Sequence, residues 1–111
     1  MVDFTTRTIG TNVTVIQPTG RLNMAAASTL RKQLQDIVEG GSSRIVVDLS
    51  TTDFIDSSGL GALISGLKIA RQEGGDLRIA ATPKQVGTVL ELTNLNRVLP
   101  TYESVDTAFD D

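Results

Sequence analysis

The chain has 111 residues, a formal net charge of −3, and 40% hydrophobic and 21% charged residues, which predicts one small globular domain over residues 1–111. It contains no cysteine and no histidine, which excludes disulfides, thiolate nucleophiles and histidine-based acid–base catalysis. The acidic balance and the 4% aromatic content argue against nucleic acid or an anionic membrane as the main partner. No apolar run approaches the roughly 20 residues that span a bilayer, and we expect no membrane insertion and a cytoplasmic location.

Hydrophobic periodicity predicts that strands and helices alternate along the chain. The predicted elements are strands over residues 4–9 and 13–17, a helix over 24–39, a strand over 44–49, a helix over 57–73, a strand over 77–81, a third helix after Thr82–Pro83, a short strand at 98–99 and a last helical turn or two over 104–109. This order predicts an α/β fold: a mostly parallel central β-sheet with an antiparallel edge hairpin, covered by about four helices.

Turn and cap residues set the expected boundaries of these elements. Gly10–Asn12 suits a hairpin link, and Gly20 predicts a turn after the second strand. Asn23 is a suitable N-cap for the first helix. Residues 50–55 are predicted to be a short loop, and Thr82 is predicted to cap the third helix with Pro83 as its first residue.

The most informative segment runs from Asp53 to Gly61, between a buried strand and a helix N-terminus. Asp56, Ser57 and Ser58 stand where the first backbone N–H groups of the helix lack internal partners. One polar residue is enough for a cap, so three in a row leave both helix capping and a functional site open. The glycine at position 59 and Gly61 weaken the helix and indicate either close packing or a low-relief contact surface.

Several enzyme chemistries lack their residues. The serines are not in a Gly-x-Ser-x-Gly context, and no histidine is available to activate them. A phosphate loop is absent, and Gly59-x-Gly61 is only half of a dinucleotide fingerprint. Asp48, Asp53 and Asp56 are more typical of solvated or capping acids than of a magnesium site. We therefore expect no catalytic residues, no cofactor and no metal.

Residues 54–61, Phe-Ile-Asp-Ser-Ser-Gly-Leu-Gly, follow the strand at 45–49 and closely resemble the signature of the STAS domain (sulphate transporter and anti-sigma factor antagonist). The resemblance is closest to the free-standing bacterial anti-sigma factor antagonists. Residues 19–23, Thr-Gly-Arg-Leu-Asn, resemble the family's turn before the first helix. Residues 90–95 resemble its segment before the last strand.

This resemblance implies a phosphorylation switch. It implies that Ser57 is phosphorylated by an anti-sigma factor that is also a serine/threonine kinase, and that a metal-dependent serine phosphatase restores it. The unmodified antagonist would bind the kinase and release the sigma factor. The ordinary apolar content gives no sign of a large exposed patch, and we therefore expect a monomer when the protein is free. The partner-binding residues that we predict are Asp56, Ser58, Gly59, Gly61, Arg21 and Asn23.

Two residues depart from the family pattern. Asn23 stands where antagonists often have Asp, which keeps the capping ability but loses a charge near the expected acceptor. Asn94 stands where Gly is frequent, and Asn tolerates the left-handed conformation.

Two other functions stay open: a non-switching STAS accessory subunit of a lipid or solute transport system, and, with the least support, a small enzyme.

Overall fold

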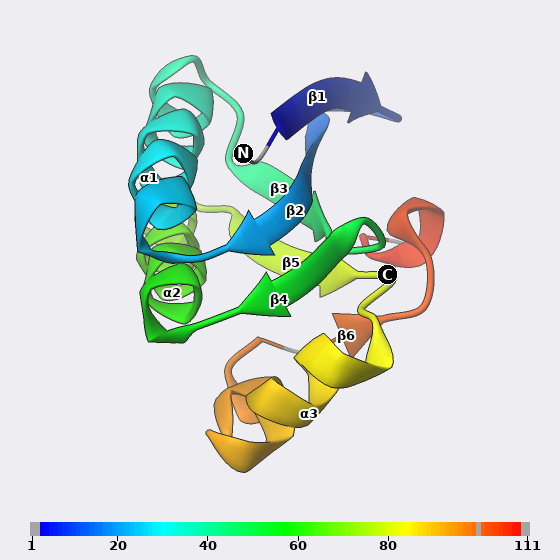
Figure 1. Ribbon diagram of the computed structural model, residues 1–111. Helices are drawn as coiled ribbons and strands as arrows, with labels where there is room; N and C mark the ends of the chain where they lie inside the picture. The colour runs from blue at the N-terminus through cyan, green and yellow to red at the C-terminus, as the bar shows by residue number, and fades with distance from the viewer. Residues whose placement is uncertain (1–2, 100, 110–111) are drawn as a thin grey trace.

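A computed structural model describes residues 3–99 and 101–109 as a sheet with helices packed against it (Figure 1). The strands are β1 (Asp3–Ile9), β2 (Val13–Leu22), β3 (Arg44–Asp48), β4 (Thr52–Ile55), β5 (Asp76–Ala80) and β6 (Thr101–Tyr102). The α-helices are α1 (Met24–Glu39), α2 (Ser57–Gln72) and α3 (Lys84–Leu92), and two short 3₁₀ turns are η1 (Leu95–Arg97) and η2 (Val105–Thr107).

The sheet has the strand order β1-β2-β3-β5-β6, and β4 pairs with the second half of β2. Only the β1–β2 hairpin is antiparallel, while every other described pair is parallel. In this order β3 is the central strand. Its β-branched residues Ile45, Val46 and Val47 are fully buried, as expected for a parallel strand that is covered on both faces. The predicted fold class is confirmed, with three α-helices in the described ranges instead of about four.

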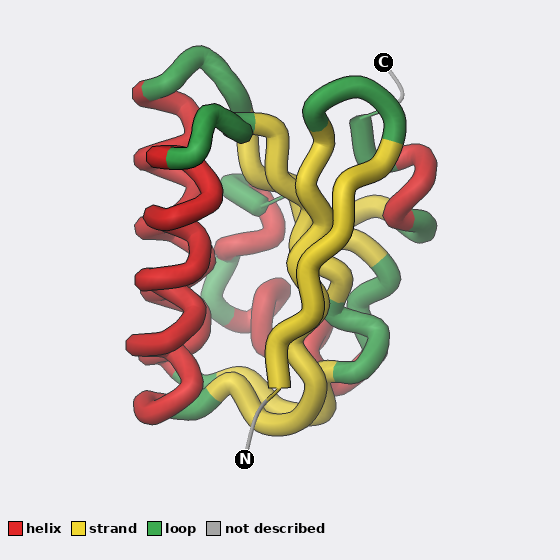
Figure 2. The backbone as a smooth tube through the Cα atoms, turned by 90° about the horizontal axis from the view of Figure 1, so that it is seen from above, coloured by secondary structure: helices red, strands yellow, loops and turns green. Residues whose placement is uncertain are grey.

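Helices α1 and α2 lie side by side on one face of the sheet (Figure 2). Their apolar stripes enter the main core, where Leu30 and Leu34 of α1 and Leu63 and Leu67 of α2 are buried. These four residues are core residues, as predicted. In the described part of the chain, no helix combines the length and the apolarity needed to cross a bilayer.

The opposite face of the sheet is covered by the C-terminal segment around η2. There Val105 and Ala108 pack onto the outward-facing residues of β2, β3 and β5 and form a second, smaller apolar cluster. The predicted helical turn at 104–109 is a single 3₁₀ turn, whose first N–H groups are capped by the Ser104 hydroxyl, an acceptor for Asp106 N at 3.1 Å.

The strand β2 does not end in a turn at Gly20, and residues 50–55 are not all loop. Gly20 has φ +114° and introduces a register shift, after which β2 continues and pairs with β4. On this edge of β2, Pro18 lies between the pairing with β3, which ends at Ile16, and the pairing with β4, which begins at Gly20. Its carbonyl oxygen accepts from the buried Thr52 Oγ1 at 2.9 Å. The prediction of a loop over residues 50–55 was wrong for β4 because this strand is short and its pairing partner, β2, is distant in sequence.

Two predicted boundaries in the last third were also wrong. Residues 98–99 are not a strand: Leu99 N donates to the carbonyl of Leu95 at 2.7 Å, and the last strand is Thr101–Tyr102. Helix α3 begins at Lys84 with Pro83 as its cap, and no side chain caps it. Thr82 stands one position too early for the cap, because the chain turns through the left-handed residue Ala81 (φ +55°) before the helix.

Candidate functional site

The β2–β4 pairing brings the two motif segments together at the carboxyl end of the strands. Arg21 is the register partner of Phe54, and Leu22 is the partner of Ile55. Each strand then leads directly into a helix, β2 into α1 and β4 into α2. Figure 1 shows both helices starting at this end of the sheet. The segments 19–23 and 54–61, which are far apart in sequence, therefore form one site.

Both helices are capped by the residue that follows the paired strands. The Asn23 side chain accepts from Ala26 N at 3.2 Å, and the Asp56 carboxylate accepts from Gly59 N at 3.0 Å. The backbone N–H of Asp56 donates to the carbonyl of Leu22 at 3.3 Å, which ties the two caps together. Capping thus occupies Asp56, so its carboxylate is a fixed negative charge beside the serines.

The two serines begin α2 and differ in exposure. Ser57 is exposed and Ser58 is half-buried. Within residues 3–99 and 101–109, neither hydroxyl makes a hydrogen bond. The Ser57 hydroxyl is consequently accessible to another protein, and no contact in the described chain has to break for it to react.

The two glycines of the motif have different surroundings. Gly59 is buried, and a Cβ there would meet the Leu22 carbonyl oxygen at 2.5 Å and Ile55 Cγ1 at 2.8 Å. Gly61 is half-buried, and a Cβ there would meet only the end of the Arg31 side chain, at 3.0 Å. Close helix–sheet packing therefore accounts for Gly59. Whether either glycine contacts a partner stays a prediction.

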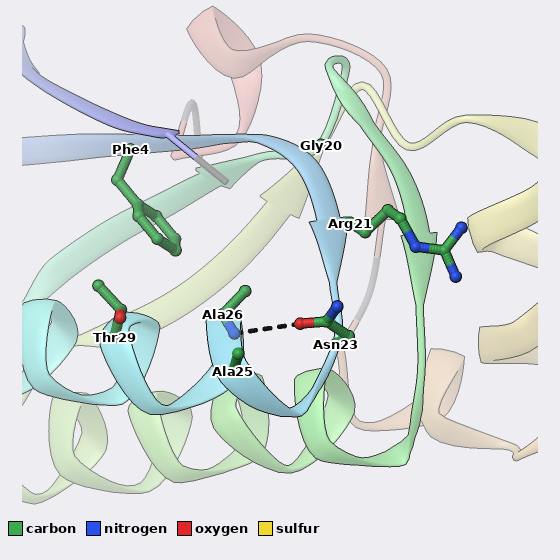
Figure 3. A pocket seen from close by; sticks show the side chains of 7 residues that line it. All are labelled: Phe4, Gly20, Arg21, Asn23, Ala25, Ala26 and Thr29. Atoms are coloured by element: carbon green, nitrogen blue, oxygen red, sulfur yellow. Dashed lines mark hydrogen bonds between the residues drawn. The ribbon is translucent and has the colours of Figure 1, made fainter. Parts of the chain in front are cut away.

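Arg21 and Asn23 line a hollow of about 400 Å³ on the α1 side of the site, between the start of β1 and the first turns of α1 (Figure 3). Figure 3 shows the Arg21 side chain pointing away from Phe4 and Thr29. Its guanidinium instead stacks on the Phe54 ring at 4.0 Å from the centroid. The stack holds the Arg21 guanidinium over β4.

Ser57 and Gly61 line a second hollow of about 450 Å³ on the other side of α2, which we call the α2 groove. Its lining is Ser57, Leu60, Gly61, Ile64, Ser65, Lys68, Thr93 and Leu95. Only Ser57 and Gly61 of these residues were predicted as site residues. The helical spacing of the α2 residues could have indicated that they share one side of the helix. The contribution of Thr93 and Leu95 could not be read from the sequence, because it depends on where α3 packs.

The described residues offer no group of three acidic side chains that could hold a metal ion. Asp48 accepts from the backbone N–H of Ser50 at 2.9 Å, and Asp56 caps α2, so both carboxylates already have local roles. The arrangement at this end of the sheet consists of two capped helix starts, a stacked arginine and an exposed serine.

The STAS domain family matches residues 5–108, which is nearly the whole chain. This chain belongs to the STAS domain family. The family implied by that resemblance is thereby confirmed, and the segment 54–61 that carried it is the helix start described above. In this STAS domain it occupies the end of β4 and the first turns of α2.

Relatives of this STAS domain are small proteins of similar length. A Thermotoga maritima protein, named as a candidate anti-sigma factor antagonist, is 30% identical over 101 residues, which cover 90% of this chain and 89% of the relative. A crystal structure of a Thermotoga maritima protein with the same description matches with 30% identity and a TM-score of 0.88 over 96% of this chain and 92% of that one. The anti-sigma F factor antagonist of Paenibacillus polymyxa is 26% identical over 83% of this chain and 80% of its own length.

The unphosphorylated form of the anti-sigma factor antagonist SpoIIAA has the same fold, with a TM-score of 0.82 at 19% identity over 97% of this chain and 94% of that one. The phosphorylated form of SpoIIAA matches with a TM-score of 0.74 at 18% identity over 97% of each chain. This fold has therefore been solved in both forms of that protein.

Proposed function

We propose that this STAS domain is an anti-sigma factor antagonist that switches partners through phosphorylation of Ser57. In the unphosphorylated form it binds an anti-sigma factor with serine kinase activity and releases the sigma factor. Phosphorylation of Ser57 prevents binding, and a metal-dependent serine phosphatase reverses it. The domain is then a regulatory binding protein and kinase substrate that acts in the cytoplasm as a monomer.

The observation that carries this proposal is the exposed, unbonded Ser57 hydroxyl at the first position of α2. A kinase needs access to the hydroxyl, and this one is available without unfolding. A phosphate there would also face the positive end of the helix dipole and free backbone N–H groups, which favour an anion. The free domain should therefore keep its fold when phosphorylated.

In a protein–protein contact the same phosphate would be unfavourable. Phosphoserine carries about −1.5 to −2 charges at neutral pH. Asp56 adds a negative charge next to it, and its carboxylate is already committed to Gly59 N. If burying this charge costs about 3–4 kcal/mol, affinity falls by a factor of several hundred. A single site can thus tolerate the group in the free domain and reject it in the complex.

The names of the relatives support the same role. Two relatives that are 26% identical to this chain are named as anti-sigma factor antagonists. The Paenibacillus polymyxa protein covers 83% of this chain, and the Staphylococcus aureus protein covers 78%. Arg21 and Asn23 lie at the end of the sheet where Ser57 begins α2, which supports their inclusion in the contact surface with Asp56, Ser58, Gly59 and Gly61.

The deciding experiment is phosphopeptide mass spectrometry on the protein purified from its own cells. We expect a phosphoryl group on the peptide that contains Ser57, lost in Ser57→Ala and retained in Ser58→Ala. Because the two serines are adjacent, Ser58→Ala is the matched control. An unmodified Ser57 across growth and stress conditions would contradict the switch and favour a constitutive accessory subunit of a transport system.

A comparison of binding by two Ser57 variants complements the mass spectrometry. Protein captured by Ser57→Ala from cell extract should be missing with Ser57→Asp, and the captured protein should bind ATP. Equal capture by the two variants would argue against phosphorylation as the control step.

A further inference from the structure

Arg31 of α1 lies against the first turns of α2. A Cβ added at Gly61 would meet Nη2 of the Arg31 guanidinium at 3.0 Å. Because glycine has no side chain, the guanidinium can lie close to the α2 backbone at this position. Gly61 and Ser57 are four residues apart and line the same side of the helix. Helix α1 therefore supplies a cation to the side of α2 on which the expected phosphate acceptor stands.

This arginine has no partner in the part of the chain that the structure describes. Its guanidinium takes part in no ion pair, hydrogen bond or ring contact there, and the residue is exposed. Its neighbour Lys32 differs, because it pairs with Asp36 at 3.6 Å. Arg21, at the carboxyl end of β2, is stacked on Phe54. All five guanidinium N–H donors of Arg31 are consequently available to an anion.

The Ser57 side chain lies within reach of this guanidinium. Residues four apart on a helix have Cβ positions about 5–6 Å from each other. Together with the 3.0 Å between the Cβ position of Gly61 and Nη2, this places Nη2 of Arg31 at most about 9 Å from Cβ of Ser57. A phosphoryl group lengthens the serine side chain, and the exposed arginine can change rotamer, so the two groups can meet without any movement of the backbone.

We propose that Arg31 pairs with the phosphoryl group on Ser57 in the free domain and thereby bridges α1 and α2; this rests on the proposed function. The guanidinium presents its donors in a planar fork that matches two phosphate oxygens. Its charge offsets part of the repulsion between the phosphate and Asp56, which directly precedes the serine. Arg31 is then a positioning residue for the phosphate, and Gly61 leaves the room in which it lies.

The test uses phosphoserine that is incorporated genetically at position 57 of the full chain, so that no kinase is needed. The phosphorus NMR signal is titrated through the second ionisation of the phosphate, at about pH 6. A paired guanidinium favours the dianion and lowers the pKa of the phosphate. Arg31→Gln should therefore raise the titration midpoint by about half a pH unit. Arg31→Lys keeps the charge without the fork and should raise it less.

Two other cations provide matched controls for this titration. Lys32→Gln removes the neighbouring charge of α1, and Lys68→Gln removes a charge on the same side of α2, eleven residues and about 16 Å beyond Ser57. Both should change the midpoint by less than half as much as Arg31→Gln. Circular dichroism verifies that each variant folds.

A second measurement reports on contact instead of charge. In proton–nitrogen NMR spectra, phosphorylation should shift the Nε–H signal of Arg31 and leave that of Arg71, which pairs with Asp76, in place. An unchanged Arg31 signal overturns the proposal. A phosphate midpoint that Arg31→Gln leaves unchanged, or that Lys32→Gln raises equally, also overturns it.

The outcome is separable from that of the proposed function. A serine at position 57 that is never phosphorylated in cells would contradict the switch, but the titration of the incorporated phosphoserine would still show whether Arg31 pairs with it. Conversely, a titration without an Arg31 effect would leave the phosphopeptide result standing.

Discussion

At the scale of single residues, the site combines one structural acid, one exposed hydroxyl and two glycines with different roles. Asp56 accepts from the Gly59 N–H and directly precedes Ser57. The adjacent hydroxyl of Ser57 has no partner in the described chain. The acid therefore contributes to stability and the serine does not, and substitutions can separate the two.

Asp56→Ala should lower the free energy of unfolding by about 1 kcal/mol, because the Gly59 N–H loses its acceptor. Asp56→Asn keeps an acceptor oxygen and should lose less than half of that. Urea denaturation measures both. A loss in Asp56→Asn as large as in Asp56→Ala would mean that the charge, and not the cap, stabilises this helix start.

Gly59→Ala and Gly61→Ala should change stability in opposite directions. At Gly59 the new Cβ meets the backbone oxygen of Leu22, which cannot swing away, so we expect a loss of about 1–3 kcal/mol. At Gly61 it meets only the flexible end of Arg31, and replacing glycine in a helix should add up to about 1 kcal/mol. The same urea titrations measure both. A destabilised Gly61→Ala would contradict this assignment.

The larger substitution Gly61→Arg should leave the fold largely intact and abolish binding of the anti-sigma factor, because the glycine lines the α2 groove. Circular dichroism checks the fold, and capture from cell extract checks binding. An unfolded Gly61→Arg would assign this glycine to packing.

At the scale of elements, the short strand β4 positions the site. It is held to β2 by three register pairs and by the Thr52 hydroxyl, which donates to the carbonyl of Pro18. This pairing places the start of α2 beside the start of α1. A strand of four residues has few contacts of its own, so each anchoring bond matters for the position of Ser57.

Thr52→Val should cost about 1 kcal/mol and increase hydrogen exchange in β4 more than in β3, because the buried hydroxyl is lost from inside the element. Thr51→Val is the control: Thr51 donates to the same carbonyl at 3.0 Å but is exposed. Uniform acceleration of exchange across the whole sheet would show that β4 is not a separate local unit.

At the scale of the whole molecule, the two faces of the sheet are protected unequally. Helices α1 and α2 cover one face and α3 adds Val86 and Leu90 to the same core, whereas the segment around η2 covers the other face. Arg78 anchors that segment: it donates to the carbonyl of Ala108 at 2.8 Å, pairs with Asp76 at 3.2 Å and lies 4.3 Å from the Phe109 ring centroid. Arg78 of β5 thus adds polar contacts to the apolar packing that holds the C-terminal segment on the sheet.

Arg78→Ala should destabilise the protein by about 2 kcal/mol, since the Ala108 carbonyl and the Asp76 carboxylate lose the hydrogen bonds of a guanidinium whose side chain is only 17% exposed. Hydrogen exchange should accelerate first at residues 105–109. Arg71→Ala removes the more exposed ion pair to Asp76 and should cost less than about 1 kcal/mol. Equal exchange rates at 105–109 in both variants would contradict the anchoring role.

Local signals in the sequence were enough for the elements that carry long periodic stripes. The α1 and α2 stripes, the β-branched run of β3 and the caps Asn23 and Asp56 all depend on residues within a turn or two of each other. The STAS signature is likewise one continuous run of residues, so the expected acceptor Ser57 could be named from sequence. Capping and periodicity are short-range effects, so the residues that carry them can be recognised without knowledge of distant partners.

Tertiary structure decided what depends on distant partners. The strand β4 forms because β2 continues past Gly20 and pairs with it. Gly59 has no room for a side chain because the carbonyl of Leu22, 37 positions earlier in the chain, packs against it. The α2 groove needs Thr93 and Leu95, which α3 brings to the open side of α2. Packing between segments far apart in the chain is a property of the folded molecule. The sequence by itself therefore determined the fold class and the expected phosphate acceptor, Ser57. The tertiary structure decided which residues form the surface around that serine.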